Sequence, residues 1–420
     1  MPKALTVNGA WSWFADPRAV HSAGRIYTGW VDMQARVWVA QILDDRAAGY
    51  PVRRFLLSDR SVVGPEDVLA DDHANPVILV RGGRVVVFWS GHGGPQMNYR
   101  IATGQQDVTA FGPVLTAPTP TGPYGNTYPN PWQLSDGKVY LTYRGAANFQ
   151  PFVTRTDSLS VPSHWEQPRH MIAAAAGERP YLKAVAAGGS TLHLVFTDGH
   201  PRNVATSVYH AKYQNNEFKR TDGSVITGWT GLPFAVGQAT RVFDGPGHGV
   251  RCWIWDIQLA ASTGFEPRII FSTLPSGTAR TGHQYWYAAW TGTGWRTAKV
   301  ADAGGTIAQD GEDSYSGGAA LDPLRPDSRM WLSRPNPVTG VHDIQLWTSV
   351  DSGLTWQPDP SRTLTPSADQ RVRPVAVRDY PDPGRLLWME GPYQTFTDFG
   401  TRLVLGDAPA AGSAPAAPVT

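Results

Sequence analysis

Residues 349–356 read SVDSGLTW and fit the pattern S-x-D-x-G-x-T-W, known as the Asp-box, at every specified position. In this motif the Ser and Asp side chains cap a tight hairpin turn, and the Trp packs between sheets. Weaker echoes, TRTDSLSVPSHWEQP (154–168) and AWTGTGWRTAKV (289–300), follow other strand-like pairs. Recurrence of one turn motif near the outer edges of successive sheets predicts a β-propeller.

The rest of the chain supports an all-β fold. The 44 Gly and 35 Pro residues separate short β-rich runs such as RIYTGWVD (25–32) and VVVFWS (85–90). No β–α–β alternation interrupts them, so the pattern is an antiparallel meander, which a sandwich, a barrel or a propeller would satisfy. The Asp-box pattern favours the propeller. At about 50–60 residues per four-stranded blade, 420 residues predict seven blades, with six as the alternative. We expect a single antiparallel propeller over residues 1–407 and a flexible Ala/Pro/Gly-rich tail over 408–420.

Composition limits the partners. The chain carries 17% charged residues and a net charge of +1, which argues against nucleic acid or an anionic membrane as its main partner. The single cysteine, Cys252, excludes an internal disulfide framework. No run reaches the roughly 20 apolar residues of a membrane span. The start, MPKALTVNGAWSW, shows no apolar signal-peptide core, so the sequence does not show how the protein would be exported.

Two histidines bracket one predicted hairpin. In DDHANPVILVRGGRVVVFWSGHGG (71–94), His73 precedes the strand VILV and His92 follows the strand VVVFW, with Gly-Gly between them. Antiparallel strands that begin and end at one edge bring these imidazoles together. Tyr128 and Arg144 take the same two places around the next predicted hairpin, so all four side chains are expected in one pocket at the mouth of the central channel.

Several motifs together resemble one family. They are NGAWSWFADPRAV (8–20), DDHANP (71–76), SGHGG (90–94), TYPNPWQL (127–134), RPYLKAV (179–185), FTDGHPRN (196–203), SVYHAKY (207–213) and DSYSGGAALDP (313–323). Over residues 8–357 the chain resembles the BNR-repeat-containing propeller family, which includes the ulvan lyases and the lyases that cut rhamnose–glucuronate linkages. The resemblance implies a polysaccharide lyase acting by β-elimination at C4 of a uronic acid. The same family also resembles a small group of rhamnosidases.

That chemistry needs a cation on the substrate carboxylate, a base for the C5 proton and an acid for the leaving oxygen. The resemblance implies His73, His92, Tyr128 and Arg144 as the catalytic set, with Arg144 neutralising the carboxylate. His73 is the first choice for a single residue acting as both base and acid. Each residue also has a structural alternative. His73 could cap the end of a strand and His92 could hold a turn. Tyr128 could be an aromatic residue packed between blades, and Arg144 could pair with a carboxylate of its blade. Asp71 and Asp72 would fix or charge the His73 imidazole, or cap its turn.

Further residues are expected to bind an acidic sugar. Arg179, Tyr181 and Lys183 alternate, as residues on one face of a strand do, although a solvated strand would look the same. NGAWSWFADPR is expected to be a strand of the first blade, with Trp11 and Trp13 on one face. The remaining candidates for substrate binding are Asp16, Arg18, Asn75 and His200.

No metal is expected in catalysis. A structural zinc or calcium ion is a further possibility, because some ulvan lyases hold a zinc ion near the stretch that contains His200. The candidate ligands are His200, His210, His248 and Cys252, although their spacing matches no diagnostic zinc pattern.

Two other functions remain open. A hydrolase on the same scaffold could use Glu312, Asp313 and Tyr315, but a glycosidase needs a pair of carboxylates that the sequence does not supply clearly. A non-catalytic glycan-binding protein, such as a virion tail component with assembly partners, is the other alternative. The expected partner of the lyase is an acidic polysaccharide or oligosaccharide, encountered outside the cell or at a cell surface.

Overall fold

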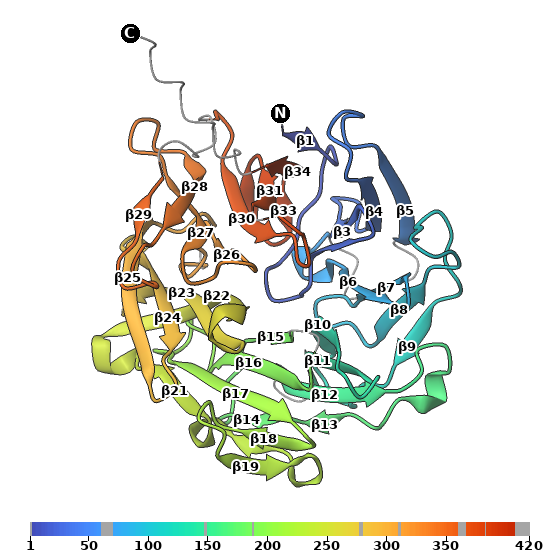
Figure 1. Ribbon diagram of the computed structural model, residues 1–420, viewed down its shortest axis with the longest axis horizontal. Coiled ribbons are helices and arrows are strands. Elements are labelled where there is room, and N and C mark those ends of the chain that lie inside the picture. Colours follow the sequence, from blue (N-terminus) through green and yellow to red (C-terminus); the bar gives the residue numbers. More distant parts are fainter. Residues whose placement is uncertain are drawn as a thin grey trace.

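Seven antiparallel sheets stand in a ring (Figure 1), which confirms the seven-bladed propeller. The structure is a computed structural model and describes residues 2–59, 70–146, 149–186, 189–276, 280–309, 312–359, 367–382 and 384–407. The predicted tail over 408–420 lies outside the described residues. Among the residues described, no helix is long and apolar enough to cross a membrane.

The first three blades follow one another along the chain, each with four strands in sequence order from the channel outward. Blade 1 comprises β2 (Ala19–Ser22), β3 (Arg25–Val31), β4 (Val37–Leu43) and β5 (Val52–Ser58). Blade 2 comprises β6 (Val77–Arg81), β7 (Arg84–Trp89), β8 (Met97–Ile101) and β9 (Leu115–Ala117). Blade 3 comprises β10 (Asn126–Gln133), β11 (Val139–Gly145), β12 (Gln150–Thr156) and β13 (Arg169–His170).

The next three blades differ in their outer strands. Blade 4 comprises β15 (Leu182–Ala186), β16 (Thr191–Thr197), β17 (Val208–Gln214), β18 (Glu217–Lys219), β19 (Val225–Gly228) and β21 (Thr240–Phe243), and β18 and β21 both pair with β17. Blade 5 comprises β22 (Val250–Ala260), β23 (Glu266–Pro275), β24 (His283–Trp290) and β25 (Trp295–Gly304). Blade 6 comprises β26 (Ala319–Leu321), β27 (Arg329–Pro335), β28 (His342–Thr348) and β29 (Gln357–Pro358).

Blade 7 joins the two ends of the chain. Its inner strands are β30 (Arg371–Ala376), β31 (Arg385–Glu390) and β34 (Arg402–Asp407), and its outermost strand is β1 (Lys3–Ala4) from the N-terminus. Lys3 and Ala4 pair with Leu405 and Val404, and the Leu5 amide donates to the Leu403 carbonyl (2.7 Å). Figure 1 shows β1 beside β34 at the top of the ring. The ring is therefore closed by hydrogen bonds between chain ends.

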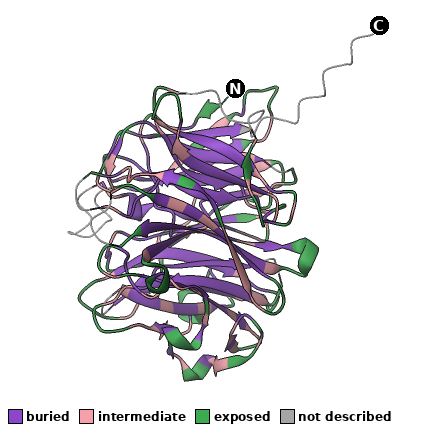
Figure 2. Cartoon of the chain, turned by 90° about the vertical axis from the view of Figure 1, so that its left-hand side faces the viewer, coloured by how far each residue is buried: buried purple, intermediate pink, exposed green. Residues whose placement is uncertain are grey.

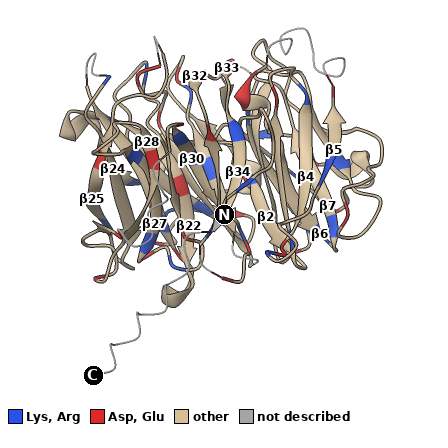
Figure 3. Ribbon diagram, turned by 90° about the horizontal axis from the view of Figure 1, so that it is seen from above, with Lys and Arg blue, Asp and Glu red and all other residues tan. Residues whose placement is uncertain are grey.

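Short elements complete the ring. The pair β14 (Ile172–Ala173) and β20 (Phe234–Ala235) is parallel, and β32 (Tyr393–Thr395) with β33 (Asp398–Phe399) forms a small hairpin on the upper rim in Figure 3. The 3-10 turns are η2 (Asp72–Ala74), η4 (Pro162–His164), η5 (Trp229–Gly231), η6 (Val236–Gln238), η7 (Pro246–His248) and η8 (Ala261–Thr263). Figure 3 also shows basic and acidic residues interspersed over the ring.

Most blade strands are buried on both faces, because each sheet packs between two neighbours (Figure 2). This explains the continuous apolar runs in the sequence. The hairpin of blade 2 has the predicted strands β6 and β7. Gly82 (φ 55°) and Gly83 (φ 76°) form its turn in the left-handed region, where residues without a Cβ are favoured.

The Asp-box lies at the turn between β28 and β29. Asp351 accepts hydrogen bonds from the amides of Leu354 (3.0 Å) and Thr355 (2.9 Å), and from the hydroxyl of Ser349 (2.7 Å). The Trp356 ring packs against Tyr287 of blade 5, with 5.1 Å between ring centroids. The turn therefore has the capped form that the motif predicts, and its Trp joins two blades.

The first-blade expectation for NGAWSWFADPR is wrong for most of that segment. The inner strand of blade 1 begins only at Ala19, and residues 11–16 instead cross the central channel. Trp13 Nε1 donates to the carbonyl of Ile254 in blade 5 (2.9 Å), and Asn130 of blade 3 donates to the carbonyl of Phe14 (2.8 Å). We call residues 11–16 the channel segment. Because its bulky rings contact several blades at once, it fills the middle of the ring rather than extending one sheet.

Candidate active site

The carboxylate of Asp71 hydrogen-bonds to both His73 and His92. Asp71 caps the short turn η2, where its side chain accepts from the His73 amide (2.8 Å). Its Oδ1 lies 2.6 Å from His73 Nδ1, and its Oδ2 lies 2.9 Å from His92 Nδ1. The two imidazoles are stacked, with ring centroids 3.9 Å apart and planes 4° from parallel. The predicted meeting of His73 and His92 is therefore confirmed, and Asp71 leaves the Nε2 atom of each ring for other partners.

The two imidazoles differ in basicity. Burial alone would lower the pKa of His73, but the carboxylates of Asp71 and Asp72 outweigh it and raise that pKa to about 10. Burial and the neighbouring charge of His73 lower the pKa of His92, against the opposing effect of Asp71. Near neutral pH the pair therefore holds a charged His73 beside a neutral His92. Environments that separate two titrating groups in this way suit an acid and a base.

Asp72 is anchored from blade 7. Its carboxylate accepts from the guanidinium of Arg373 and from the hydroxyl of Tyr393 (2.7 Å), and all three side chains are buried. Burial would raise the pKa of Asp72, but Arg373 and His73 together lower it. Sequence reasoning missed Arg373 and Tyr393, because they follow Asp72 by some 300 residues and belong to no motif. They keep a second negative charge near His73.

Tyr128 and Arg144 join the histidines, as predicted. Tyr128 lies inside β10 rather than before it, at an irregular position of the strand with φ 59°. Its ring is stacked near that of His73, 5.3 Å between centroids. Burial and the proximity of Tyr181 raise the pKa of Tyr128 well above its usual value, so Tyr128 is a neutral phenol that can donate but is a poor base.

Arg144 is a buried cation among aromatic rings. Its guanidinium carbon lies 4.4 Å from the ring centroid of Tyr181, 4.8 Å from that of Tyr128 and 4.9 Å from that of Phe149. Within the described part of the chain, Nε and Nη1 of Arg144 are buried without a hydrogen-bond partner. Cation–π contacts offset part of the cost of burying this charge. An anionic group bound from outside would satisfy the remainder.

Other predicted residues lie around this cluster. Tyr181 contacts Phe14 of the channel segment (4.7 Å), and His200 meets the Tyr181 ring edge-on (5.1 Å). His200 Nδ1 accepts from the Arg202 amide (3.0 Å), so a neutral His200 carries its proton on Nε2. Burial, then the charges of Arg202, Arg144 and Arg179, lower the pKa of His200. The site thus has several cations and a neutral histidine donor.

Two aromatic residues of the site had no sequence signal. Phe396, between β32 and β33, meets the rings of His73 and His92 edge-on, at 5.1 and 5.6 Å. Phe149, after β11, lies 5.8 Å from the guanidinium of Arg179 as well as near Arg144. Both come from loops, where isolated aromatic residues show no periodic pattern.

Four of the expected substrate-binding residues do not reach this cluster. Asn75 is fully buried and its side-chain oxygen accepts from the Ser12 amide (3.0 Å), so it holds the channel segment. Lys183 ion-pairs with Asp16, which also pairs with Arg18 (2.8 Å). Asp16 and Arg18 pair in the channel as expected, but in a separate pocket. Lys183 therefore does not share the site of Arg179 and Tyr181. The expectation that the three share one strand face is wrong, because β15 begins only at Leu182 and Arg179 and Tyr181 precede it.

Each carboxylate among the hydrolase candidates pairs with an arginine. Glu312 ion-pairs with Arg202 (2.6 Å), and Asp313 with Arg280 (3.3 Å). Tyr315 is buried against the channel segment, edge-on to Trp13. Burial raises the pKa of Glu312, with Arg202 opposing it.

The four proposed metal ligands are not brought together. Among the described residues, a metal-like grouping of ligand atoms occurs at Asp71, His73 and His92, within 4.8 Å of one another. There the carboxylate oxygens already accept from both Nδ1 atoms, so hydrogen bonds account for the arrangement. His210 instead pairs with His193 (3.1 Å), His248 stacks on Phe243, and Cys252 is buried.

Comparisons with known proteins agree with the fold. The profile of the family described as "BNR repeat-containing family member" matches residues 25–303. The match spans more than half of the chain, and the chain belongs to this BNR repeat-containing family, as the motifs indicated. No curated protein sequence matches it.

Solved structures give the same architecture. An ulvan lyase of polysaccharide lyase family PL25, bound to -[GlcA(1-4)Rha3S]-, has a TM-score of 0.74 and 15% identity, covering 97% of this chain and 96% of that chain. The polysaccharide lyase Uly1 has a TM-score of 0.58 and 11% identity, covering 94% and 90%. At these identities the similarity shows the fold alone.

Proposed function

We propose that the protein is a polysaccharide lyase that cleaves the bond to C4 of a uronic acid, with glucuronate joined to rhamnose as the expected unit. The guanidinium of Arg144, whose Nε and Nη1 are buried without a hydrogen-bond partner among the described residues, carries this proposal, because it lies beside an imidazole pair with separated pKa values. A uronate carboxylate is the anion that would satisfy Arg144 and place C5 near the imidazoles. The ulvan lyases of the same fold support this choice of substrate class.

The proposed reaction assigns one step to each group. Arg144 pairs with the carboxylate and stabilises the enolate-like charge that develops on it. Neutral His92, whose side chain is 32% exposed, accepts the C5 proton at Nε2. The electron pair forms the C4–C5 double bond as the C4–O4 bond breaks, and O4 takes the proton from Nε2 of charged His73. Between turnovers His92 loses its proton and His73 regains one.

The stacked rings suit the stereochemistry of glucuronate. In this sugar the C5 hydrogen and the C4 oxygen lie on the same side of the bond that becomes double. Acid and base must then approach from one side, as two stacked imidazoles anchored by one carboxylate can do. Tyr128, held as a neutral phenol, donates a hydrogen bond rather than acting as the base. This assignment divides between two histidines the roles first given to His73 alone.

The deciding experiment offers the protein rhamnose–glucuronate polymers, such as ulvan and gum arabic, with two readouts. A lyase produces both new reducing ends and the ultraviolet absorbance of a conjugated unsaturated uronate. A hydrolase would give reducing ends without that absorbance, and a glycan-binding protein neither. Absence of the absorbance with every uronate polymer tested would overturn the proposal. Such substrates would place the protein's activity outside the cell or at a cell surface.

A variant pair tests the role of Arg144. Arg144→Lys keeps the charge but loses the planar fork that fits a carboxylate, and we expect its kcat/KM to fall by at least about tenfold. Arg155→Lys is the matched control, because Arg155 also stacks on an aromatic ring, that of Trp229 (4.1 Å), but pairs with Glu166 away from the histidines. Equal activity of both variants would contradict the assignment.

A further inference from the structure

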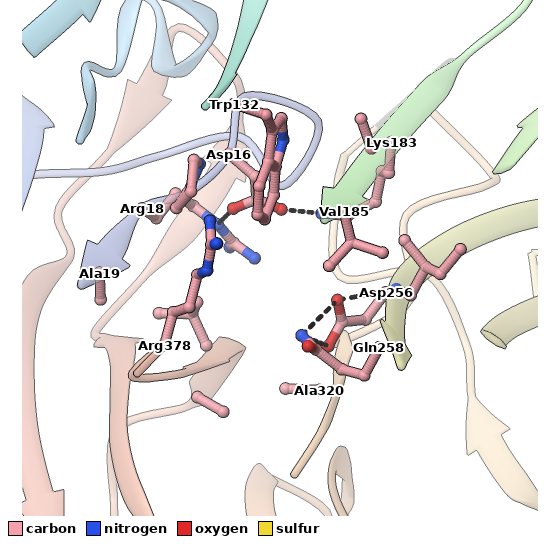
Figure 4. Close-up of a pocket in the computed structure, with 15 residues that line it drawn as sticks. Asp16, Arg18, Ala19, Trp132, Lys183, Val185, Asp256, Gln258, Ala320 and Arg378 are labelled. Atoms are coloured by element: carbon pink, nitrogen blue, oxygen red, sulfur yellow. Dashed lines mark hydrogen bonds and ion pairs between the residues drawn. The ribbon is translucent and has the colours of Figure 1, made fainter. Parts of the chain in front are cut away.

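A second polar pocket lies inside the ring, apart from the imidazole pair. Its wall includes Asp16, Arg18, Lys183, Asp256, Gln258 and Arg378 (Figure 4). The cavity measures about 40 Å³, and a water molecule needs about 10–15 Å³ on the same measure. The pocket therefore has room for a few waters or for one small ion.

The channel segment separates this pocket from the candidate active site. The Trp13 ring stacks on Trp255 (4.2 Å), and Phe14 packs toward Tyr128 and Tyr181. Lys183 reaches the Trp13 carbonyl from the pocket side. No imidazole of the pair lines the pocket, nor does Arg144. A ligand here would not be the polysaccharide.

Positive charge exceeds negative charge on the pocket wall. Three cations, Arg18, Lys183 and Arg378, face two carboxylates, Asp16 and Asp256. Asp16 forms ion pairs with both Arg18 Nε (2.8 Å) and Lys183. The carboxylate of Asp256 accepts hydrogen bonds from the amides of Ile257 (2.8 Å) and Leu321 (3.0 Å) and from the side chain of Gln258 (3.3 Å). The ion pair of Arg378 is instead with Asp379, which does not line the pocket.

The two guanidinium groups differ: Arg18 is incompletely satisfied, whereas Arg378 is partly exposed and has partners. Arg18 is 3% exposed, and among the described residues its Nη1 is buried without a hydrogen-bond partner. Arg378 lies on the Trp132 ring (3.6 Å), donates to the Ala186 carbonyl (3.2 Å), and has its nearest carboxylate, the exposed Asp379, 3.6 Å from Nε. In Figure 4 the Arg18 and Arg378 side chains are both seen on the wall of the pocket. Arg18 and Arg378 carry like charges on one pocket wall, and an anion between them would offset their repulsion.

We propose that this pocket binds one small inorganic anion, of the size of chloride or bromide, between the guanidinium groups of Arg18 and Arg378. The anion accepts from Arg18 Nη1 and offsets the excess positive charge. Because Arg18 follows the channel segment and Arg378 follows β30, the bound ion joins the first and last blades. It acts as a structural ligand of the ring, independent of the proposed elimination.

Binding tightens as the pH falls through about 6. Burial raises the pKa of Asp256 to about 6, with Lys183 opposing the shift and Asp16 adding to it. Protonation of Asp256 removes one negative charge from a pocket that also holds Asp16, Lys183, Arg18 and Arg378. The net positive charge is then larger, so an anion is held more tightly at acid pH.

The direct test is crystallographic. Crystals of the full chain grown in sodium bromide should show an anomalous difference peak between the guanidinium groups of Arg18 and Arg378. Absence of a peak at that place would overturn the proposal, whatever peaks occur on the surface. This readout needs no variant and no substrate, so it is independent of the outcome of the lyase assay.

Thermal melting provides the second test. At constant ionic strength, replacing sodium gluconate, whose anion is too large for the cavity, by sodium chloride should raise the Tm saturably. Arg378→Gln should abolish the chloride-dependent increase, whereas Arg53→Gln, at a side chain that is 66% exposed, should keep it. Identical melting of the wild-type protein in both salts, or an undiminished chloride effect in Arg378→Gln, would contradict the site.

Discussion

At the scale of single residues, Asp71 gives two identical side chains different properties. It accepts from the Nδ1 atoms of both His73 and His92, yet only His73 also has a second carboxylate, Asp72 Oδ1, at 3.1 Å. The additional negative charge favours the protonated form of His73, and the resulting positive charge disfavours protonation of the neighbouring ring. The difference in pKa between the two rings thus follows from two adjacent aspartates in the sequence.

Asp71→Asn tests this positioning role. An amide keeps the size of the side chain but removes its charge, so the pKa of His73 should fall and the histidines should lose orientation. We expect kcat to decrease by about 10²-fold, within the range that positioned acid–base groups contribute. The alkaline limb of the pH profile should move to lower pH, because His73 loses its proton earlier. A lower rate with an unshifted profile would mean that Asp71 acts only through packing.

The wild-type pH profile follows from the same pair. The base His92 must be unprotonated and the acid His73 protonated. Since the pKa of His92 is lowered below its usual 6.5 and that of His73 is raised to about 10, kcat/KM should rise at acid pH, remain level, and fall near pH 10. Initial rates between about pH 4 and pH 11 measure this, with a stability control at each pH. A fall centred near pH 7 would contradict the assignment of His73 as the acid.

At the scale of elements, the Asp-box turn makes a local contribution that can be separated from the site. Asp351 accepts from the amides of Leu354 and Thr355, and the turn lies on the outer part of blade 6. Asp351→Ala removes the cap, so these two amides should exchange faster with solvent. Hydrogen exchange read by mass spectrometry measures this, and lyase activity should not change. Unaltered exchange at the turn would show that the backbone holds its form without the cap.

Features that depend on residues close together in the sequence were predicted correctly, whereas features that depend on distant residues were not. The hairpin of β6 and β7 and the neighbouring pair β10 and β11 are set by nearby residues, so the proximity of four side chains was predictable. The path of the channel segment could not be predicted, because Trp13 and Phe14 are fixed by residues of blades 5 and 3, which lie far along the chain. Likewise the alternation of Arg179, Tyr181 and Lys183 predicted one strand face, but β15 begins at Leu182, so only Lys183 lies in the strand.

At the scale of the whole molecule, the candidate site depends on the closed ring. His73 and His92 come from blade 2, Tyr128 and Arg144 from blade 3, and Arg373 from blade 7. Arg373 can bind Asp72 only if the last blade lies beside the first two. The pairing of β1 with β34 therefore supports the electrostatics of His73 as well as the fold.

Leu5 tests the closure with an internal control two residues away. Leu5 follows β1, is fully buried, and bonds by its amide to Leu403, whereas Val7 is 94% exposed. Leu5→Ala should lower the free energy of unfolding by about 2–5 kcal/mol, because it leaves a cavity where the chain ends meet. Val7→Ala removes a similar amount of apolar side chain from water and should leave stability almost unchanged. Tm values from calorimetry compare the two. Equal Tm values would show that the N-terminal strand is dispensable for closure, and that the inner strands alone hold blade 7 against blade 1.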